Sequence, residues 1–106
     1  MGAERFITFA GGSSAAVAFK AALRSAHQDY GTAGYTGTIA EKSEFQFVDP
    51  PENLKELNHY QLETWIKEKM DNIDYKDPPF WDDKWGPAAC MKVGETDFYF
   101  FGWSST

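Results

Sequence analysis

The chain has 106 residues and a formal net charge of −6 at pH 7, which predicts a single domain spanning residues 1–106. Phe, Tyr and Trp make up 17% of the residues, so we expect a folded domain whose core consists largely of aromatic rings. The sequence has no apolar run of the ~20 residues that cross a bilayer. We expect no secretory signal at its N-terminus. The acidic net charge argues against direct binding of nucleic acid.

The first half of the chain predicts a strand, a helix and an extended segment. Residues 5–9 combine aromatic and β-branched side chains before a pair of glycines, as in a strand that ends at a turn. Residues 15–30 have apolar side chains at helical spacing, and Ser13 or Ser14 can cap the N-terminus of that helix. Residues 38–48 alternate in polarity and predict one strand, or a hairpin that turns at Lys42.

The second half predicts a helix followed by a long loop. Asn58 and Gln61 have the spacing of a capping box, in which each side chain bonds to the backbone N–H of the other residue. Apolar side chains then continue at helical spacing, which predicts a helix over residues 59–72. Residues 71–87 contain several prolines and aspartates and predict a loop.

The last part of the chain predicts a β-hairpin over residues 88–93 and 97–103. Its second strand has rings on both faces, so we expect it to be central in a covered sheet or half-covered by a partner chain, which includes self-association through this strand. The order β-α-β(β)-α-β-β predicts an α+β fold. The expected architecture is a two-layer sandwich, in which two helices cover one face of a mixed or antiparallel sheet of four or five strands.

The acidic residues are concentrated in residues 49–86, which contain ten acidic and five basic residues. Within this region, residues 71–87 mix aromatic rings with aspartates, a composition that favours binding to a basic protein partner through ring contacts and charge attraction. The alternative is that the rings fold back and cap the sheet. The candidate partner-binding residues are Asp74, Tyr75, Asp77, Phe80, Trp81, Asp82, Asp83 and Trp85.

A second candidate site lies between the first predicted strand and helix, at Gly11, Gly12, Ser13 and Ser14. Free backbone N–H groups at the start of a helix can hold a phosphate or a nucleotide. Neither the Walker pattern nor the G-x-G-x-x-G pattern is present, so a glycine turn followed by a helix cap is the alternative interpretation.

Side chains for catalysis or metal binding are few and widely spaced. His27, His59 and Cys90 lack the spacing of a zinc site, so we expect no metal, no cofactor and no enzymatic activity. An enzyme that uses Cys90 or His27 is the third hypothesis. A single cysteine is also typical of a reducing compartment, and we expect the protein in the cytoplasm.

Three motifs resemble small uncharacterised proteins encoded by tailed bacteriophages: GYTGTIAEK at residues 34–42, KWGPA at residues 84–88 and FFGW at residues 100–103. The resemblance implies a phage accessory protein made in the cytoplasm of the bacterial host. Small acidic phage proteins often act by occupying a host protein. We therefore expect a non-enzymatic binding protein that inhibits a basic or nucleic-acid-binding host factor, such as a defence factor. The alternative is a small-ligand sensor or sponge that binds a phosphate or nucleotide at the second candidate site.

Overall fold

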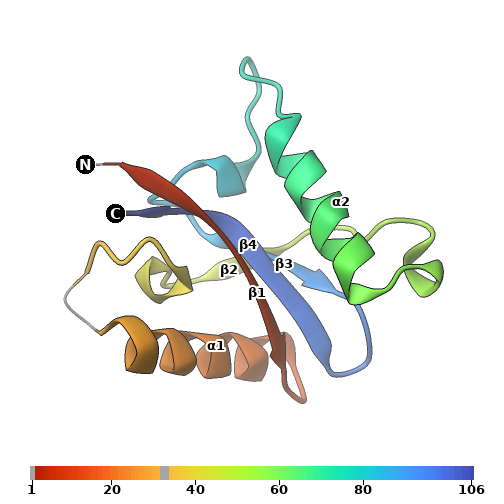
Figure 1. The fold of residues 1–106 in the computed structure, drawn as a ribbon, viewed down its shortest axis with the longest axis horizontal. Helices are drawn as coiled ribbons and strands as arrows, with labels where there is room; N and C mark the ends of the chain where they lie inside the picture. Colours follow the sequence, from red (N-terminus) through yellow and green to blue (C-terminus); the bar gives the residue numbers. More distant parts are fainter. Residues whose placement is uncertain (1, 32–33) are drawn as a thin grey trace.

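A computed structural model describes residues 2–31 and 34–106 of the chain. Within these residues it contains two α-helices, four strands and three 3₁₀ helices (Figure 1). The α+β class, the mixed sheet and the element order β-α-β-α-β-β are confirmed. In chain order the elements are β1 (Ala3–Gly11), α1 (Ala15–Tyr30), η1 (Ile39–Glu41), β2 (Phe45–Phe47), η2 (Leu54–Glu56), α2 (His59–Asp71), η3 (Phe80–Asp82), β3 (Ala88–Lys92) and β4 (Asp97–Ser105).

The sheet has the strand order β1-β4-β3-β2. The pairs β1–β4 and β3–β4 are antiparallel, and β2 runs parallel to β3. β1 pairs with β4 along its whole length, from Ala3 opposite Ser105 to Gly11 opposite Asp97. The predicted hairpin of the last two strands is therefore confirmed, and β1 and β2 form the two edges of the sheet.

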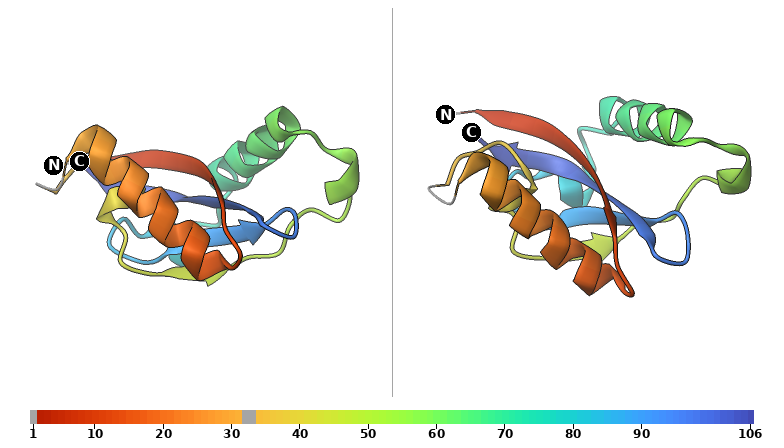
Figure 2. Two further views of the ribbon diagram at one scale, coloured as in Figure 1. Left: turned by 90° about the horizontal axis from the view of Figure 1, so that it is seen from below. Right: turned by 60° about the horizontal axis from the view of Figure 1, so that its bottom comes forward.

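The two helices cover opposite faces of the sheet, and Figure 2 shows the strands running between them. Successive side chains of a strand point to opposite faces, and those of β4 divide into two clusters. Phe98 and Phe100 pack with α1, whereas Tyr99 and Phe101 pack with α2. The expectation of a two-layer sandwich with both helices on one face is therefore wrong, because the sheet lies between two helical layers.

Aromatic rings fill the layer between α1 and the sheet. The ring centroid of Phe19 lies 5.0 Å from that of Phe45 and 5.4 Å from that of Phe100. Ala18 and Ala22 are buried beside Phe19 on the same helix, and their small side chains let α1 approach the sheet closely. The prediction of an aromatic core is thus confirmed on this face.

Local capping signals set the start of both helices. The Ser14 hydroxyl accepts a hydrogen bond from the Val17 N–H at 3.2 Å, so Ser14 caps α1. Asn58 and Gln61 form the predicted capping box of α2, with N–H to side-chain oxygen distances of 2.8 and 2.9 Å. Both helices therefore begin where the sequence predicted.

Residues 38–48 differ from the prediction. The Thr38 hydroxyl accepts from the Ala40 N–H at 3.1 Å and starts the 3₁₀ helix η1 instead of a strand. Within the described residues of this segment, only Phe45–Phe47 forms a strand. This strand is parallel to β3, so the alternative of a hairpin that turns at Lys42 is wrong and the sheet has four strands.

The last strand, β4, is central in the sheet. It is flanked by β1 and β3, and its side chains from Phe98 to Phe101 are at most 3% exposed. The rings on both of its faces are explained by the two helical layers that cover them. The prediction of self-association through this strand is therefore wrong, because a second chain has no access to it.

Candidate protein-binding surface

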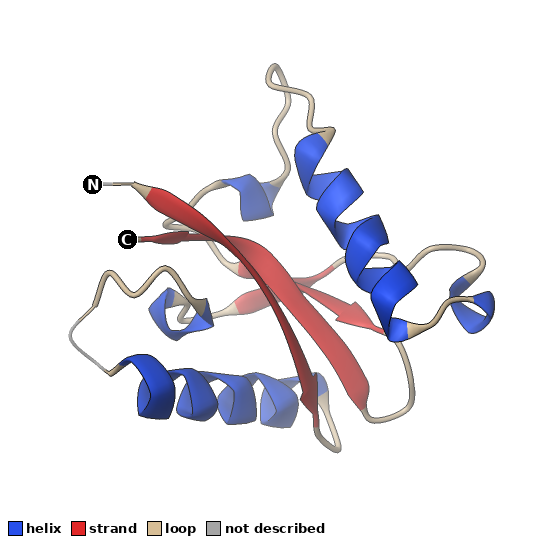
Figure 3. Cartoon of the chain, in the orientation of Figure 1, coloured by secondary structure: helices blue, strands red, loops and turns tan. Residues whose placement is uncertain are grey.

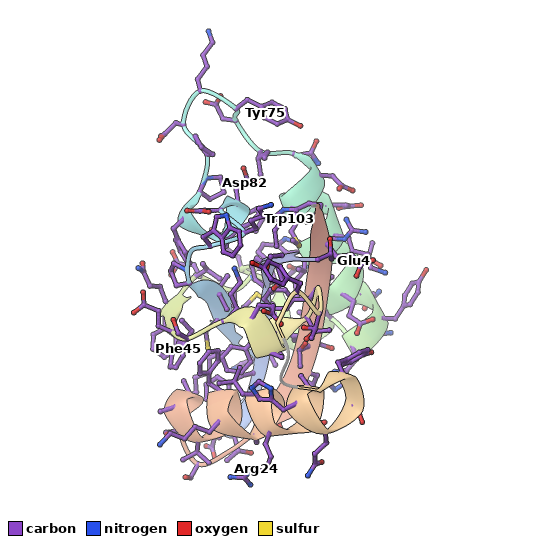
Figure 4. The ribbon with its side chains drawn as sticks, turned by 90° about the vertical axis from the view of Figure 1, so that its left-hand side faces the viewer. Glu4, Arg24, Phe45, Tyr75, Asp82 and Trp103 are labelled. Carbon is purple, nitrogen blue, oxygen red and sulfur yellow. The ribbon has the colours of Figure 1, made fainter. Side chains whose placement is uncertain are left out.

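The loop between α2 and β3 projects from the domain at residues 74–77 (Figure 3). Its hydrogen bonds are local: the Lys76 N–H donates to Asp74 Oδ1 at 3.0 Å, and the Asp77 N–H donates to the Asp74 carbonyl at 3.1 Å. Tyr75 is 85% exposed, and Figure 4 shows it at the end of the loop, with Asp82 nearer the body of the domain. Asp74, Tyr75 and Asp77 are accessible; Asp74 lines a groove with Phe80 and Trp81, whereas Tyr75 lies apart at the end of the loop.

Trp81 belongs to the core. It is 2% exposed, and its ring centroid lies 5.5 Å from that of Phe101 in the cluster beneath α2. Gly102 allows this approach, since a Cβ there would lie only 3.3 Å from the Trp81 carbonyl oxygen. The prediction that Trp81 contacts a partner is therefore wrong, and for this ring the alternative, that it caps the sheet, is confirmed.

Three of the predicted residues share one shallow groove. Phe80, Asp82 and Asp83 line it, and its volume is about 360 Å³. Prolines and Gly86 complete the lining, so the groove presents a half-buried ring and two carboxylates on a short, proline-rich segment. This arrangement can receive a basic side chain together with the apolar part of its stem.

A buried lysine holds the turn next to this groove. Lys42 is 4% exposed, and its Nζ donates to the carbonyl oxygens of Gly86, Lys84 and Asp83 at 2.9, 3.1 and 3.4 Å. Burial lowers the pKa of Lys42, and the charge of Asp83 partly offsets that effect. One ammonium group thus bonds three carbonyls of a single turn and holds residues 83–86 against a segment that is distant in the sequence.

Trp85 projects from that fixed turn. Its side chain is 64% exposed, and its backbone N–H donates to Asp83 Oδ1 at 2.9 Å. Its ring lies edge-on to that of Tyr35, with 6.5 Å between the centroids, and Tyr35 is itself 56% exposed. The Lys84 Nζ lies 5.3 Å from the centre of the Trp85 ring. Two exposed rings therefore stand together on one side of the domain.

Glu41 orders the segment that carries Tyr35. Its carboxylate accepts from the Tyr35 N–H at 3.0 Å, from the Thr36 N–H at 3.1 Å and from the Thr36 hydroxyl at 2.7 Å. Burial opposes ionisation, but the hydrogen bonds from Thr36 and Tyr35 outweigh it and lower the pKa of Glu41. These bonds stabilise the backbone of Tyr35, whose φ of 56° is uncommon for a residue with a side chain.

We define the acidic aromatic surface as Tyr35, Phe80, Asp82, Asp83 and Trp85. Sequence reasoning found four of these residues and missed Tyr35, as well as Lys42 that anchors the turn. The sequence signal for these two residues was the motif GYTGTIAEK, which contains both Tyr35 and Lys42. In the structure these residues contact the turn that the motif KWGPA contains.

The structure gives the four residues of the second candidate site local roles. The Ser14 hydroxyl is bonded to the Val17 N–H, and the Gly12 N–H donates to the Thr96 carbonyl at 2.9 Å. A Cβ at Gly12 would lie 2.6 Å from the Ala18 nitrogen, so a glycine is needed for the turn to pack against the helix start. Gly11 and Ser13 complete the turn. Binding of a phosphate or nucleotide there stays a prediction.

The side chains considered for catalysis lie apart. Cys90 is buried, and burial raises the pKa of its thiol to about 11. His27 Nδ1 lies 3.3 Å from the Gly31 carbonyl oxygen, whereas His59 Nδ1 lies 2.8 Å from the Tyr99 hydroxyl on the other face of the sheet. Among residues 2–31 and 34–106, no group of three or more His, Cys, Asp or Glu side chains is placed to hold a metal ion.

Comparison with protein-family models, with curated proteins and with solved structures found no match to this chain. The resemblance to phage proteins therefore stays a prediction based on the three motifs. In the part of the chain that the structure describes, no helix is long and apolar enough to span a membrane.

Proposed function

We propose that this chain is a small binding protein, not an enzyme, that engages a basic host protein through the acidic aromatic surface. The proposal includes the setting implied by the sequence motifs: a phage accessory protein in the bacterial cytoplasm that inhibits a defence or nucleic-acid-handling factor. The observation that carries it is Trp85, which is 64% exposed on a turn that the buried Lys42 holds in place.

Exposed tryptophans contribute strongly to protein interfaces when their position is already fixed in the free protein. Tryptophan is enriched among the residues whose truncation costs the most binding energy. A side chain on an ordered turn also loses less conformational entropy on binding than one on a mobile loop. The three bonds from Lys42 and the contact with Tyr35 give Trp85 this order before any partner arrives.

The charge around Trp85 favours a basic partner. Asp82 and Asp83 line the adjacent groove, and the whole chain carries a net charge of −6. Lys42 adds little positive charge to the surface, because it is buried and bonded to three carbonyls. The Lys84 ammonium lies 5.3 Å from the centre of the Trp85 ring, so the negative charge next to Trp85 is that of the groove carboxylates, Asp82 and Asp83. Negative charge beside an exposed ring speeds the approach of a basic surface and disfavours an acidic one. A nucleic-acid-binding protein presents such a basic surface.

A capture experiment with matched variants tests the proposal. Wild-type protein, Trp85→Ala and Tyr60→Ala are immobilised and exposed to a bacterial lysate; Tyr60 is 78% exposed on α2 and is the control for loss of an exposed ring. We expect a basic protein that wild type and Tyr60→Ala retain and that Trp85→Ala loses. With that protein purified, we expect Trp85→Ala to raise the Kd by about thirtyfold.

Salt and charge provide a second measurement on the same complex. Asp82→Asn is expected to slow association by a few-fold at low ionic strength and to have little effect on dissociation, since it removes a steering charge. The proposal is wrong if no protein depends on Trp85 for capture, or if the captured protein binds Trp85→Ala and wild type with equal Kd.

A further inference from the structure

β1 is a long sheet edge whose outward backbone groups can be identified from the register. The Thr106 N–H donates to the Gly2 carbonyl and the Gly12 N–H donates to the Thr96 carbonyl, so the even-numbered residues of β1 bond to β4. The N–H and C=O groups of the odd-numbered residues, from Ala3 to Gly11, therefore point away from the sheet. Within residues 2–31 and 34–106, these outward groups have no hydrogen-bond partner.

A groove of about 580 Å³ lies between this edge and α1. β1 and α1 diverge from the turn that joins them, as Figure 1 shows, and residues 36–39 close the wide end. Residues 4–11 line the groove along β1, a length of roughly 25 Å at about 3.3 Å per residue. Ala21 and Ser25 line it from α1, and their small side chains leave room. The groove is therefore long and narrow enough to fit an extended chain segment.

The groove is acidic. Among its lining residues, Glu4 and Asp29 are acidic and Arg5 is the basic residue. The Arg5 side chain belongs to the other face of the sheet, where its Nη1 lies 3.1 Å from Asp71 Oδ1 on α2. Arg24 of α1 points away from the sheet, as Figure 4 shows. Both carboxylates line the groove, and among residues 2–31 and 34–106 neither of them forms a salt bridge.

We infer that the β1 edge is a second binding site, which takes an extended basic segment of another protein as an added strand. The segment's backbone bonds to the outward groups of Arg5, Ile7 and Phe9, which provides affinity for any extended chain. Alternate side chains of the segment lie in the groove, where Lys or Arg reaches Glu4 or Asp29 and provides selectivity. This site is separate from the acidic aromatic surface and does not depend on the proposed function.

A second copy of this chain is the competing occupant, because exposed strand edges also pair with each other. Pairing of β1 with β1 would bring together two chains of net charge −6 and would leave the carboxylates of each groove without a cation. A basic segment neutralises those carboxylates, so charge favours it over self-pairing.

Amide hydrogen exchange with a synthetic peptide tests this site. The probe is a capped hexapeptide in which lysine alternates with valine or threonine, and the control replaces each lysine by glutamate. In the free protein we expect the outward amides of Arg5, Ile7 and Phe9 to exchange fast and the inward amides of Phe6 and Thr8 to exchange slowly. At about 1 mM lysine peptide, we expect the outward amides to be protected by about tenfold or more, and the glutamate peptide to have no effect.

A pair of substitutions at one position isolates the backbone contribution. Arg5→Ala and Arg5→Pro both lose the ion pair with Asp71, but only Arg5→Pro removes an outward N–H, while the inward bonds to β4 are kept. We expect Arg5→Ala to retain peptide binding and Arg5→Pro to weaken it by about tenfold. A lysine peptide N-methylated at alternate amides gives the same comparison on the wild-type protein, should Arg5→Pro not fold.

Three results would overturn the inference. The first is no protection of the outward amides by the lysine peptide, and the second is equal protection by the glutamate peptide. The third is protection without any peptide that disappears on dilution, which would identify a second copy as the occupant. Trp85→Ala is expected to keep the peptide-induced protection at Ile7, so the two sites can fail independently.

Discussion

Two tryptophans four positions apart in one loop have opposite roles. Trp81 is 2% exposed and packs on the central strand, whereas Trp85 is 64% exposed and stands on a turn held by Lys42. In the sequence each ring has one charged neighbour, Asp82 for Trp81 and Lys84 for Trp85, and both lie in the same acidic, ring-rich loop. The difference arises from what the backbone meets: η3 lies against β4, and residues 83–86 lie over a buried ammonium group. An acidic, ring-rich loop can therefore be part core and part surface.

The largest expected effect is at the buried ring. Trp81→Ala removes the side chain that packs on Phe101 and leaves a cavity beneath α2, so we expect the free energy of unfolding to fall by about 3–5 kcal/mol. Trp85→Ala is the matched control and is expected to change it by less than about 0.5 kcal/mol. Urea denaturation of both variants measures this. Equal destabilisation by the two substitutions would contradict the assignment of one ring to the core and the other to the surface.

A smaller effect is expected from the anchor of the turn. Lys42→Met keeps the length of the side chain but removes the donor of the Lys84 and Gly86 carbonyls, while the Asp83 carbonyl keeps its bond from the Gly86 N–H. We therefore expect the free energy of unfolding to fall by roughly 1–3 kcal/mol. Hydrogen exchange is expected to rise at the Trp85 amide, because the turn loses its tie to the rest of the domain.

Lys76→Met is the control for the loss of a lysine, since Lys76 lies on the exposed tip of the same loop. It is expected to leave both stability and exchange at Trp85 unchanged. If Lys42→Met also left exchange at Trp85 unchanged, the order of the turn would have another source and the comparison of the two tryptophans would lose its explanation.

The elements that the sequence predicted well are those determined by neighbouring residues. Ser14 begins α1, and Asn58 with Gln61 begins α2, because a cap needs only the next three residues of the chain. The alternation of rings in β4 predicted a strand for the same reason. It also left open a central position in a covered sheet, and the structure confirms that alternative.

The features that were missed depend on distant contacts. The placement of the helices on opposite faces follows from which rings of β4 each helix covers, and either helix sequence fits either face. Lys42 is buried because it meets carbonyls more than forty positions away, and nothing in its neighbouring residues indicates this. Part of the candidate surface could thus be predicted from composition, but the order of its turn could not.

The smallest expected effect concerns the other ring of the exposed pair. The pKa of Glu41 is lowered in the folded protein, so its charge stabilises the fold above the ordinary pKa of 4.5, and this contribution is lost as the pH falls through the lowered value. Glu41→Gln is expected to be less stable than wild type at pH 7, with the difference shrinking steadily below about pH 4.5. Thermal unfolding of both proteins across this range measures it. A difference that does not depend on pH would mean that the carboxylate charge does not order the segment of Tyr35, and that Trp85 alone is held in place before binding.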